Sequence, residues 1–191
     1  ACMLPHPIFD VQQVMERVPQ DKITMLPGPP AIYQTILNHP DLETFDMTTL
    51  RLAVTGAAAI PVEMIIQMRE RLGFEKIVTG YGLTEGSGLA TMCRHDDDPE
   101  TIAKTSGRAM PGIEIRIVDD NGTELERGQP GEITVNGYNI MVGYLDDPDQ
   151  TSETITENGW LLTGDIGVMD NDGNIAITDR KKDMYINGGF N

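Results

Sequence analysis

The chain has 191 residues, of which 39% are hydrophobic, so it can bury a core and form one large domain or two small subdomains. Its 14 basic and 30 acidic residues give a formal net charge of -16, which repels nucleic acids and anionic membrane surfaces at long range. Only Cys2 and Cys93 are present, which excludes a disulfide framework and a paired-cysteine zinc motif, and no window approaches the length of a membrane span.

The amino-terminal half alternates helix-period segments with short apolar runs, as a βαβ-type layer does. Strands are expected over residues 23–26, 50–55 and 76–79, and helices over 11–18, 31–37 and after Pro61. Asp10 is placed to cap the first helix, and prolines interrupt the chain before the second. These elements predict an open α/β sheet, in which the loops after Thr55 and Thr79 follow the carboxyl ends of strands, where such sheets bind ligands.

The pattern changes near Thr105 to short alternating strands and tight turns, for example over 113–118 and 132–135. Asn121-Gly122 and Asp172-Gly173 are typical hairpin-turn pairs, because both residue types tolerate a positive φ. We therefore expect an α/β subdomain over residues 1–104 and a β-rich, distorted-barrel subdomain over 105–179.

The strongest local motif is a glycine-punctuated segment that leaves an apolar strand, Thr-Gly-Tyr-Gly-Leu-Thr-Glu-Gly-Ser-Gly at residues 79–88. Tyr81 offers an aromatic face for a base, Thr84 a hydroxyl for a phosphate oxygen, and Glu85 a hard carboxylate that suits Mg²⁺. Taken alone, the spacing favours a Gly-rich surface turn in which Thr84 and Glu85 act as caps.

The segment at residues 80–85, Gly-Tyr-Gly-Leu-Thr-Glu, resembles the signature of the adenylate-forming superfamily, which contains acyl-CoA synthetases, peptide-synthetase adenylation domains and beetle luciferases. Further segments resemble that family in the family's own order: 26–33, 50–58, 131–137 with Met141, Gly143 and Tyr144, 159–165 and 179–183. The resemblance covers nearly the whole chain. An unrelated sequence would very rarely contain all of these motifs in the same order.

The resemblance implies roles for particular residues. Adenine is expected between the backbone of Gly56, Ala57 and Ala58 and the ring of Tyr81, where small residues allow close approach. The other implied nucleotide contacts come from Gly80, Gly82, Thr84, Asp165 for the ribose hydroxyls, and Arg180 for ribose and phosphate. Thr84 and Glu85 are the expected catalytic pair, with Mg²⁺ on Glu85, and Lys182 matches the hinge. Without the family, Asp165 is equally well a cap or turn residue.

The implied reaction is that of an acid–thiol ligase. A carboxylic acid, expected to be a fatty acid or a similar apolar carboxylate, reacts with ATP to give an acyl-adenylate, and coenzyme A then displaces AMP. One alternative within the family is a domain that activates an amino acid or an aryl acid. A second alternative, for the isolated chain, is a folded module without catalytic activity.

The chain also departs from the family pattern. The phosphate loop that ends in Pro-Lys-Gly is absent, and the adenylation lysine would lie beyond Asn191, so residues 180–191 are expected to be the hinge and the start of a further domain. We expect an internal fragment, truncated at both ends, that is inactive alone and prone to associate with itself as a homo-oligomer. The expected compartment is the cytoplasm.

Overall fold

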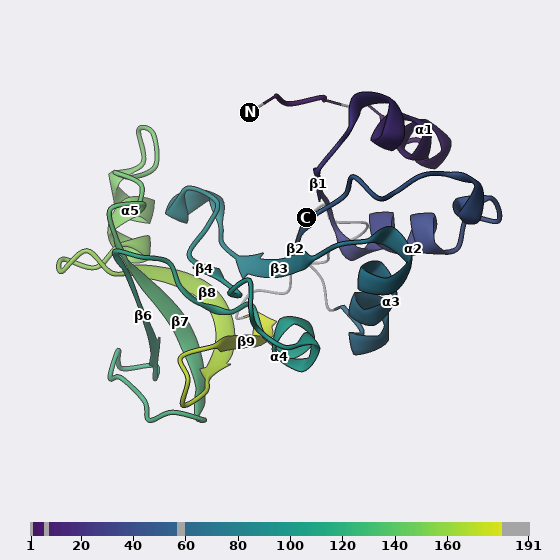
Figure 1. Ribbon diagram of the computed structural model, residues 1–191. Helices are drawn as coiled ribbons and strands as arrows, with labels where there is room; N and C mark the ends of the chain where they lie inside the picture. The colour runs from purple at the N-terminus through teal and green to yellow at the C-terminus, as the bar shows by residue number, and fades with distance from the viewer. Residues whose placement is uncertain (1, 6–7, 57–59, 181–191) are drawn as a thin grey trace. The chain divides into compact units, whose positions relative to one another are not determined.

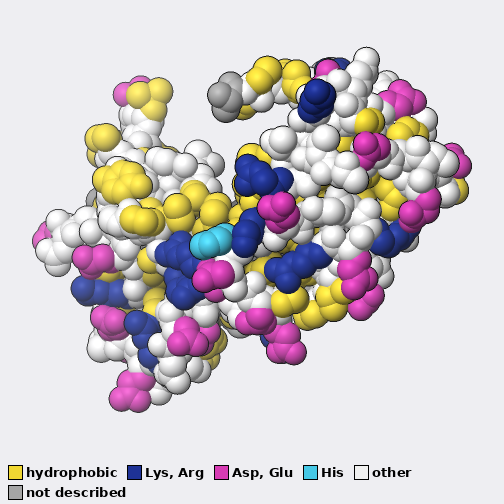
Figure 2. Space-filling model, in the orientation of Figure 1, with side chains coloured by type: hydrophobic (Ala, Val, Ile, Leu, Met, Phe, Trp, Pro, Cys, Tyr) yellow, Lys and Arg dark blue, Asp and Glu magenta, His cyan; other side chains and the backbone are white. Residues whose placement is uncertain are grey.

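The computed structural model describes residues 2–5, 8–56 and 60–180 (Figure 1). The chain divides into two compact units, Ala1–Ile77 and Val78–Asn191, called here the first and the second unit. Within the described residues, no helix is both long and apolar enough to cross a membrane. Figure 2 shows acidic and basic side chains interspersed on the visible face, so the acidic residues do not gather there in one patch.

The first unit is an α/β layer. Its elements are α1 (Val11–Asp21), β1 (Met25–Pro27), α2 (Pro30–Leu37), the 3-10 turn η1 (Leu42–Thr44), β2 (Leu52–Gly56), α3 (Val62–Leu72) and the start of β3 (Lys76–Tyr81). Strands β1 and β2 run parallel. The expected cap is confirmed, because the Asp10 side chain accepts a hydrogen bond from the Gln13 backbone N–H at 2.8 Å.

Helix α3 shows why these sequences fold as they do. Ile65, Met68 and Leu72 recur at helical spacing and are fully buried, so they supply the face that packs on the core. The helix ends at Leu72 and is capped by Gly73, whose φ of 77° is a left-handed conformation that glycine adopts without strain. The predicted helix after Pro61 is therefore confirmed.

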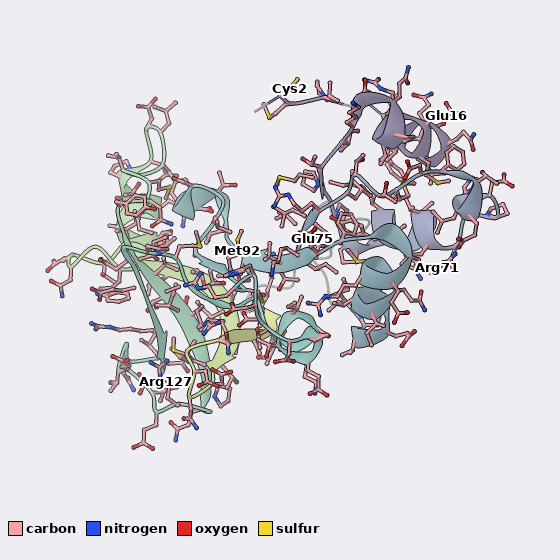
Figure 3. The ribbon with its side chains drawn as sticks, in the orientation of Figure 1. Cys2, Glu16, Arg71, Glu75, Met92 and Arg127 are labelled. Atoms are coloured by element: carbon pink, nitrogen blue, oxygen red, sulfur yellow. The ribbon has the colours of Figure 1, made fainter. Side chains whose placement is uncertain are left out.

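The second unit contains two kinds of sheet. It continues β3 and adds η2 (Thr84–Gly86), β4 (Thr91–Met92), α4 (Pro99–Lys104) and β5 (Arg108–Ala109), with β3, β4 and β5 antiparallel. Met92, labelled in Figure 3, lies opposite Gly80. The remaining elements are β6 (Ile113–Val118), β7 (Pro130–Gly137), α5 (Pro148–Thr154), β8 (Leu161–Met169) and β9 (Ile175–Arg180).

The strands fall into two sheets, with the orders β1-β2-β3-β4-β5 and β6-β7-β8-β9. The second sheet is antiparallel, and its buried residues form a core that includes Ile133, Val135, Leu161 and Ile175. Both predicted hairpin turns are confirmed, since Gly122 and Gly173 have φ of 77° and 85°. A mixed α/β fold with a separate β-rich sheet is the expected fold class.

Two expectations about strand ends are wrong. Gly80 and Tyr81 belong to β3 and not to the following loop, because they pair with Met92 and Thr91 of β4. Pro27 ends β1 and does not merely interrupt the chain. In both cases hydrogen bonding to a neighbouring strand extends the element, which local sequence preferences do not reveal.

The two compact units do not follow the change in sequence pattern. The two compact units divide inside β3, after Ile77, whereas the change of sequence pattern lies near Thr105. The assignments of residues 1–104, 105–179 and 180–191 to domains stay predictions, and residues 181–191 lie outside the described part.

Candidate functional site

Three of the predicted nucleotide-binding residues meet in the second unit. The Tyr81 hydroxyl donates a hydrogen bond of 2.6 Å to Oδ2 of Asp165, and Nε of Arg180 lies 2.8 Å from Oδ1 of the same carboxylate. Asp165 is 4% exposed and Tyr81 is 7% exposed. A buried carboxylate with a donor on each oxygen has a defined orientation, which is what recognition of two vicinal hydroxyls requires.

A β-bulge directs Asp165 toward these partners. Between the pairs Glu132↔Ile166 and Thr134↔Leu162, Ile133 of β7 faces Thr163, Gly164 and Asp165 of β8. Gly164 has a φ of 72°, and its N–H donates to the buried Glu132 carboxylate at 2.9 Å. Bulges of this kind re-aim side chains next to functional sites. Asp165 is therefore a strand residue, and reading it as a helix or turn cap is wrong.

The electrostatics of this cluster keep the tyrosine protonated. Burial raises the pKa of Tyr81 well above its usual value, and the hydrogen bond to Asp165 raises it further. Tyr81 is accordingly a permanent donor at physiological pH. The Thr163 hydroxyl supports the same turn, because it donates to the Ile133 carbonyl at 2.7 Å and accepts from the Asp165 N–H at 3.1 Å.

The loop after β3 carries Thr84 and Glu85 in the 3-10 turn η2. Thr84 is exposed and Glu85 is half-buried. The Tyr144 hydroxyl donates to Oε1 of Glu85 at 2.8 Å, and the Met141 N–H donates to the Glu85 carbonyl, also at 2.8 Å. Burial, followed by the hydrogen bond to Glu85, raises the pKa of Tyr144. Glu85 is therefore held by a segment more than fifty residues further along the chain.

Asn139 forms hydrogen bonds with the later part of this loop, residues 86–89. Its side-chain N–H₂ donates to the carbonyls of Gly86 at 2.8 Å and Leu89 at 3.1 Å, and the Ser87 hydroxyl donates back to the Asn139 carbonyl at 2.7 Å. Asn139 is buried. Asn139, which lies between residues 131–137 and Met141 of the family-like segment, was missed from the sequence, and Tyr144, which is one of the matching residues, was given no role.

Position 82 has to be glycine because the backbone of residues 88 and 89 passes very close to it. A Cβ at this position would lie 2.4 Å from the Gly88 carbonyl oxygen and 2.6 Å from the Leu89 Cα. We expect Gly82→Ala to destabilise the loop by about 1–3 kcal/mol, because backbone must move to admit the methyl group. Gly86→Ala is the matched control, since its Cβ would meet neighbours at an ordinary 3.5 Å. Hydrogen exchange of residues 82–89 should quicken in Gly82→Ala and not in the control, and equal rates would contradict this account.

Two of the remaining predicted residues, Gly56 and Gly80, belong to strands. Gly56 is the last residue of β2 and lies in the first unit. Ala57, Ala58 and Lys182 lie outside the described residues. Gly80 lies in β3 beside Tyr81, and a Cβ on it would come within 2.9 Å of the Thr91 carbonyl oxygen, so its small size serves strand pairing.

A model of the AMP-binding enzyme family matches residues 1–145, which is more than half of the chain. The chain belongs to the AMP-binding enzyme family. The resemblance to adenylate-forming enzymes is thereby confirmed, and relatives named as acyl-CoA ligases support an acyl-CoA synthetase-like relationship.

Several AMP-binding enzymes align over almost the whole chain. It is 51% identical over 191 residues to a 3-[(3aS,4S,7aS)-7a-methyl-1,5-dioxo-octahydro-1H-inden-4-yl]propanoyl:CoA ligase of Rhodococcus jostii (strain RHA1), covering 100% of this chain and 35% of that protein. It is 38% identical over 185 residues to 4-coumarate–CoA ligase 1 of Solanum tuberosum, covering 95% of this chain and 34% of that protein.

Among solved structures, the amide bond synthetase McbA from Marinactinospora thermotolerans matches with a TM-score of 0.86 and 32% identity over 95% of this chain and 36% of that chain. This likeness confirms that the chain has an α/β portion of the fold of adenylate-forming enzymes. The chain spans about a third of the length of the relatives that it matches.

Proposed function

We propose that this chain is the adenosine-binding part of a ligase that activates a carboxylic acid with ATP and transfers the acyl group to coenzyme A. The observation that carries the proposal is the buried Asp165 carboxylate, held between the Tyr81 hydroxyl and the Arg180 guanidinium. In this proposal Asp165 accepts hydrogen bonds from both ribose hydroxyls, and the Tyr81 ring stacks on adenine.

The proposed reaction has two steps. An oxygen of the substrate carboxylate attacks the α-phosphorus of ATP, and the bond to pyrophosphate breaks to leave an acyl-adenylate. The sulfur of coenzyme A then attacks the acyl carbon, AMP leaves, and the thiol proton passes to solvent or to the AMP phosphate. No protein nucleophile is needed, so the chain contributes binding, orientation and charge stabilisation.

The residues present fit a Mg²⁺ ion that is shared with the nucleotide. Among the described residues, no three His, Cys, Asp or Glu side chains form a metal-binding group. Glu85 supplies one hard carboxylate, and Mg²⁺ commonly takes one or two carboxylates and completes its shell with phosphate oxygens and water. When bound, the ion neutralises phosphate charge. Thr84 is exposed beside Glu85 and can donate its hydroxyl to a phosphate oxygen.

Tyr144 gives this assignment a direct test. In Tyr144→Phe the ring stays but Glu85 loses its 2.8 Å donor, so the carboxylate is less well oriented. We expect adenylation by the full-length enzyme to slow roughly three- to tenfold, the equivalent of about one hydrogen bond, while AMP affinity is unchanged. Pyrophosphate release measures the rate of adenylation, and calorimetric titration measures the affinity for AMP. A variant that loses AMP affinity instead would place Tyr144 in the nucleotide site.

We propose an apolar carboxylic acid as the substrate, either a fatty acid or an acid with a ring system. The relative that is 51% identical is named for a bicyclic propanoyl acid, and a relative from Bos taurus that is 36% identical is named for medium-chain acyl groups. We propose that the small residues at 86–88 line the acyl-binding pocket and leave room there for a chain or a ring system. A mass-spectrometric screen of the full-length enzyme with fatty, bicyclic, aryl and amino acids would identify the acid from its acyl-AMP product.

A second acceptor has specific support. The solved structure with a TM-score of 0.86 is an amide bond synthetase, so an amine could take the place of the coenzyme A thiol. Adding coenzyme A or an amine separately to the same screen decides between them. We also propose that the 191 residues alone form no acyl-CoA, because they span about a third of the relatives' length.

A further inference from the structure

The Tyr81 side chain has two parts with different surroundings. Its ring is the proposed adenine platform, while its hydroxyl points at Asp165 and donates at 2.6 Å to Oδ2. The residue is the last of β3, and Asp165 lies 84 positions further along the chain in β8. Stacking on adenine requires only the ring, so the hydroxyl is free for a separate purpose.

Asp165 is held from two different strands. Arg180 of β9 is its register partner and contacts Oδ1, whereas Tyr81 of β3 contacts Oδ2. Each carboxylate oxygen has about two lone pairs, so one donor on each oxygen leaves capacity for one ribose hydroxyl on each. The terminal torsion of an aspartate is soft and roughly two-fold, so these two donors decide its orientation.

We propose that the Tyr81 hydroxyl is a positioning group that fixes Asp165 for recognition of the ribose hydroxyls. This inference rests on the proposed ribose-binding role of Asp165 and adds to it the group that sets the carboxylate's orientation. Removal of the hydroxyl leaves the ion pair with Arg180 as the remaining side-chain contact to the Asp165 carboxylate among those described above. The carboxylate then samples orientations in which the two hydroxyls are not both accepted.

A double-mutant cycle isolates this coupling, because it subtracts every effect of Tyr81 that does not pass through Asp165. The full-length enzyme would be prepared as wild type, Tyr81→Phe, Asp165→Ala and the double variant, and titrated with AMP and with 2′-deoxyAMP. Phenylalanine keeps the ring for adenine, and alanine leaves no side-chain oxygen for the Tyr81 hydroxyl. We expect Tyr81→Phe to weaken AMP binding roughly three- to tenfold, the equivalent of about one hydrogen bond, and to change it little in the Asp165→Ala background.

The preference for AMP over 2′-deoxyAMP is the readout that a purely structural role would not change. We expect Tyr81→Phe to reduce this preference. General loosening of the fold would instead weaken the binding of both nucleotides by the same factor. The ratio does not depend on the fraction of protein that is folded. Tyr144→Phe is the matched control, since it removes a tyrosine hydroxyl from Glu85 instead, and its ratio should equal that of wild type.

The outcomes distinguish the positioning role of Tyr81 from the ribose-binding role of Asp165. If Asp165→Ala weakens AMP binding but Tyr81→Phe has the same effect in both backgrounds, the positioning role is overturned and the ribose assignment survives. If Asp165→Ala leaves AMP binding unchanged, the ribose assignment fails and the positioning role fails with it. If the ratio falls in Tyr81→Phe and the cycle shows coupling, the inference is supported.

Discussion

Replacing Asp165 by alanine in the full-length enzyme is expected to weaken AMP and ATP binding by about a hundredfold or more. Two charge-assisted hydrogen bonds to the ribose would be lost, at roughly 1.5–3 kcal/mol each, and every 1.4 kcal/mol is about a factor of ten in affinity. The substitution also removes the partner that lies 2.8 Å from Arg180. Calorimetric titration of the variant with AMP measures the effect directly.

The control for Asp165→Ala should remove an acidic group without touching the cluster. Glu153 is exposed on α5 in the same unit, so Glu153→Ala changes the net charge equally and should keep wild-type affinity. Thermal unfolding of both variants shows whether the fold is kept. Wild-type AMP affinity in a folded Asp165→Ala protein would remove the basis of the proposed nucleotide site.

Replacing Glu85 by alanine is expected to slow adenylation on the order of a hundredfold while leaving AMP binding nearly unchanged. The reason is that loss of a preorganised charge-stabilising group costs about this factor in other enzymes and acts on the transferring phosphate, not on adenosine. Pyrophosphate release at saturating Mg²⁺ gives the rate. An unchanged rate would show that the metal assignment to Glu85 is wrong.

Glu85→Gln separates the metal role from a structural role. Glutamine keeps an oxygen that can accept from the Tyr144 hydroxyl, which donates at 2.8 Å in the wild-type chain, but it removes the charge. We expect it to be nearly as slow as Glu85→Ala. Mn²⁺ binding in the presence of ATP, followed by electron paramagnetic resonance, should weaken in both variants. Activity near that of wild type in Glu85→Gln would mean that Glu85 only anchors the loop.

Local features of the fold could be predicted from the sequence. The Asp10 cap, the helix after Pro61 and the turns at Gly122 and Gly173 depend on groups only a few residues apart, such as the Asp10 carboxylate and the Gln13 N–H. The order of strands and helices in the first unit, and membership of the AMP-binding enzyme family, also followed from patterns within short segments.

Other features depended on contacts that the sequence does not display. Strand β3 continues through Tyr81 because β4 supplies backbone partners, and Asp165 is buried because a bulge in β8 turns it toward β3 and β9. The anchoring of Glu85 by Tyr144 joins residues 59 positions apart. The nucleotide and metal roles themselves stay predictions until the variants are measured.

The sequence by itself determined which chemical groups this protein carries and in which order its local elements form, because capping, turns and periodic burial act over a few residues. Only the tertiary structure decided how those groups are oriented. Hydrogen bonds act over about 3 Å, so the donors that orient Asp165 and Glu85 can come from anywhere in the chain that folding brings into reach.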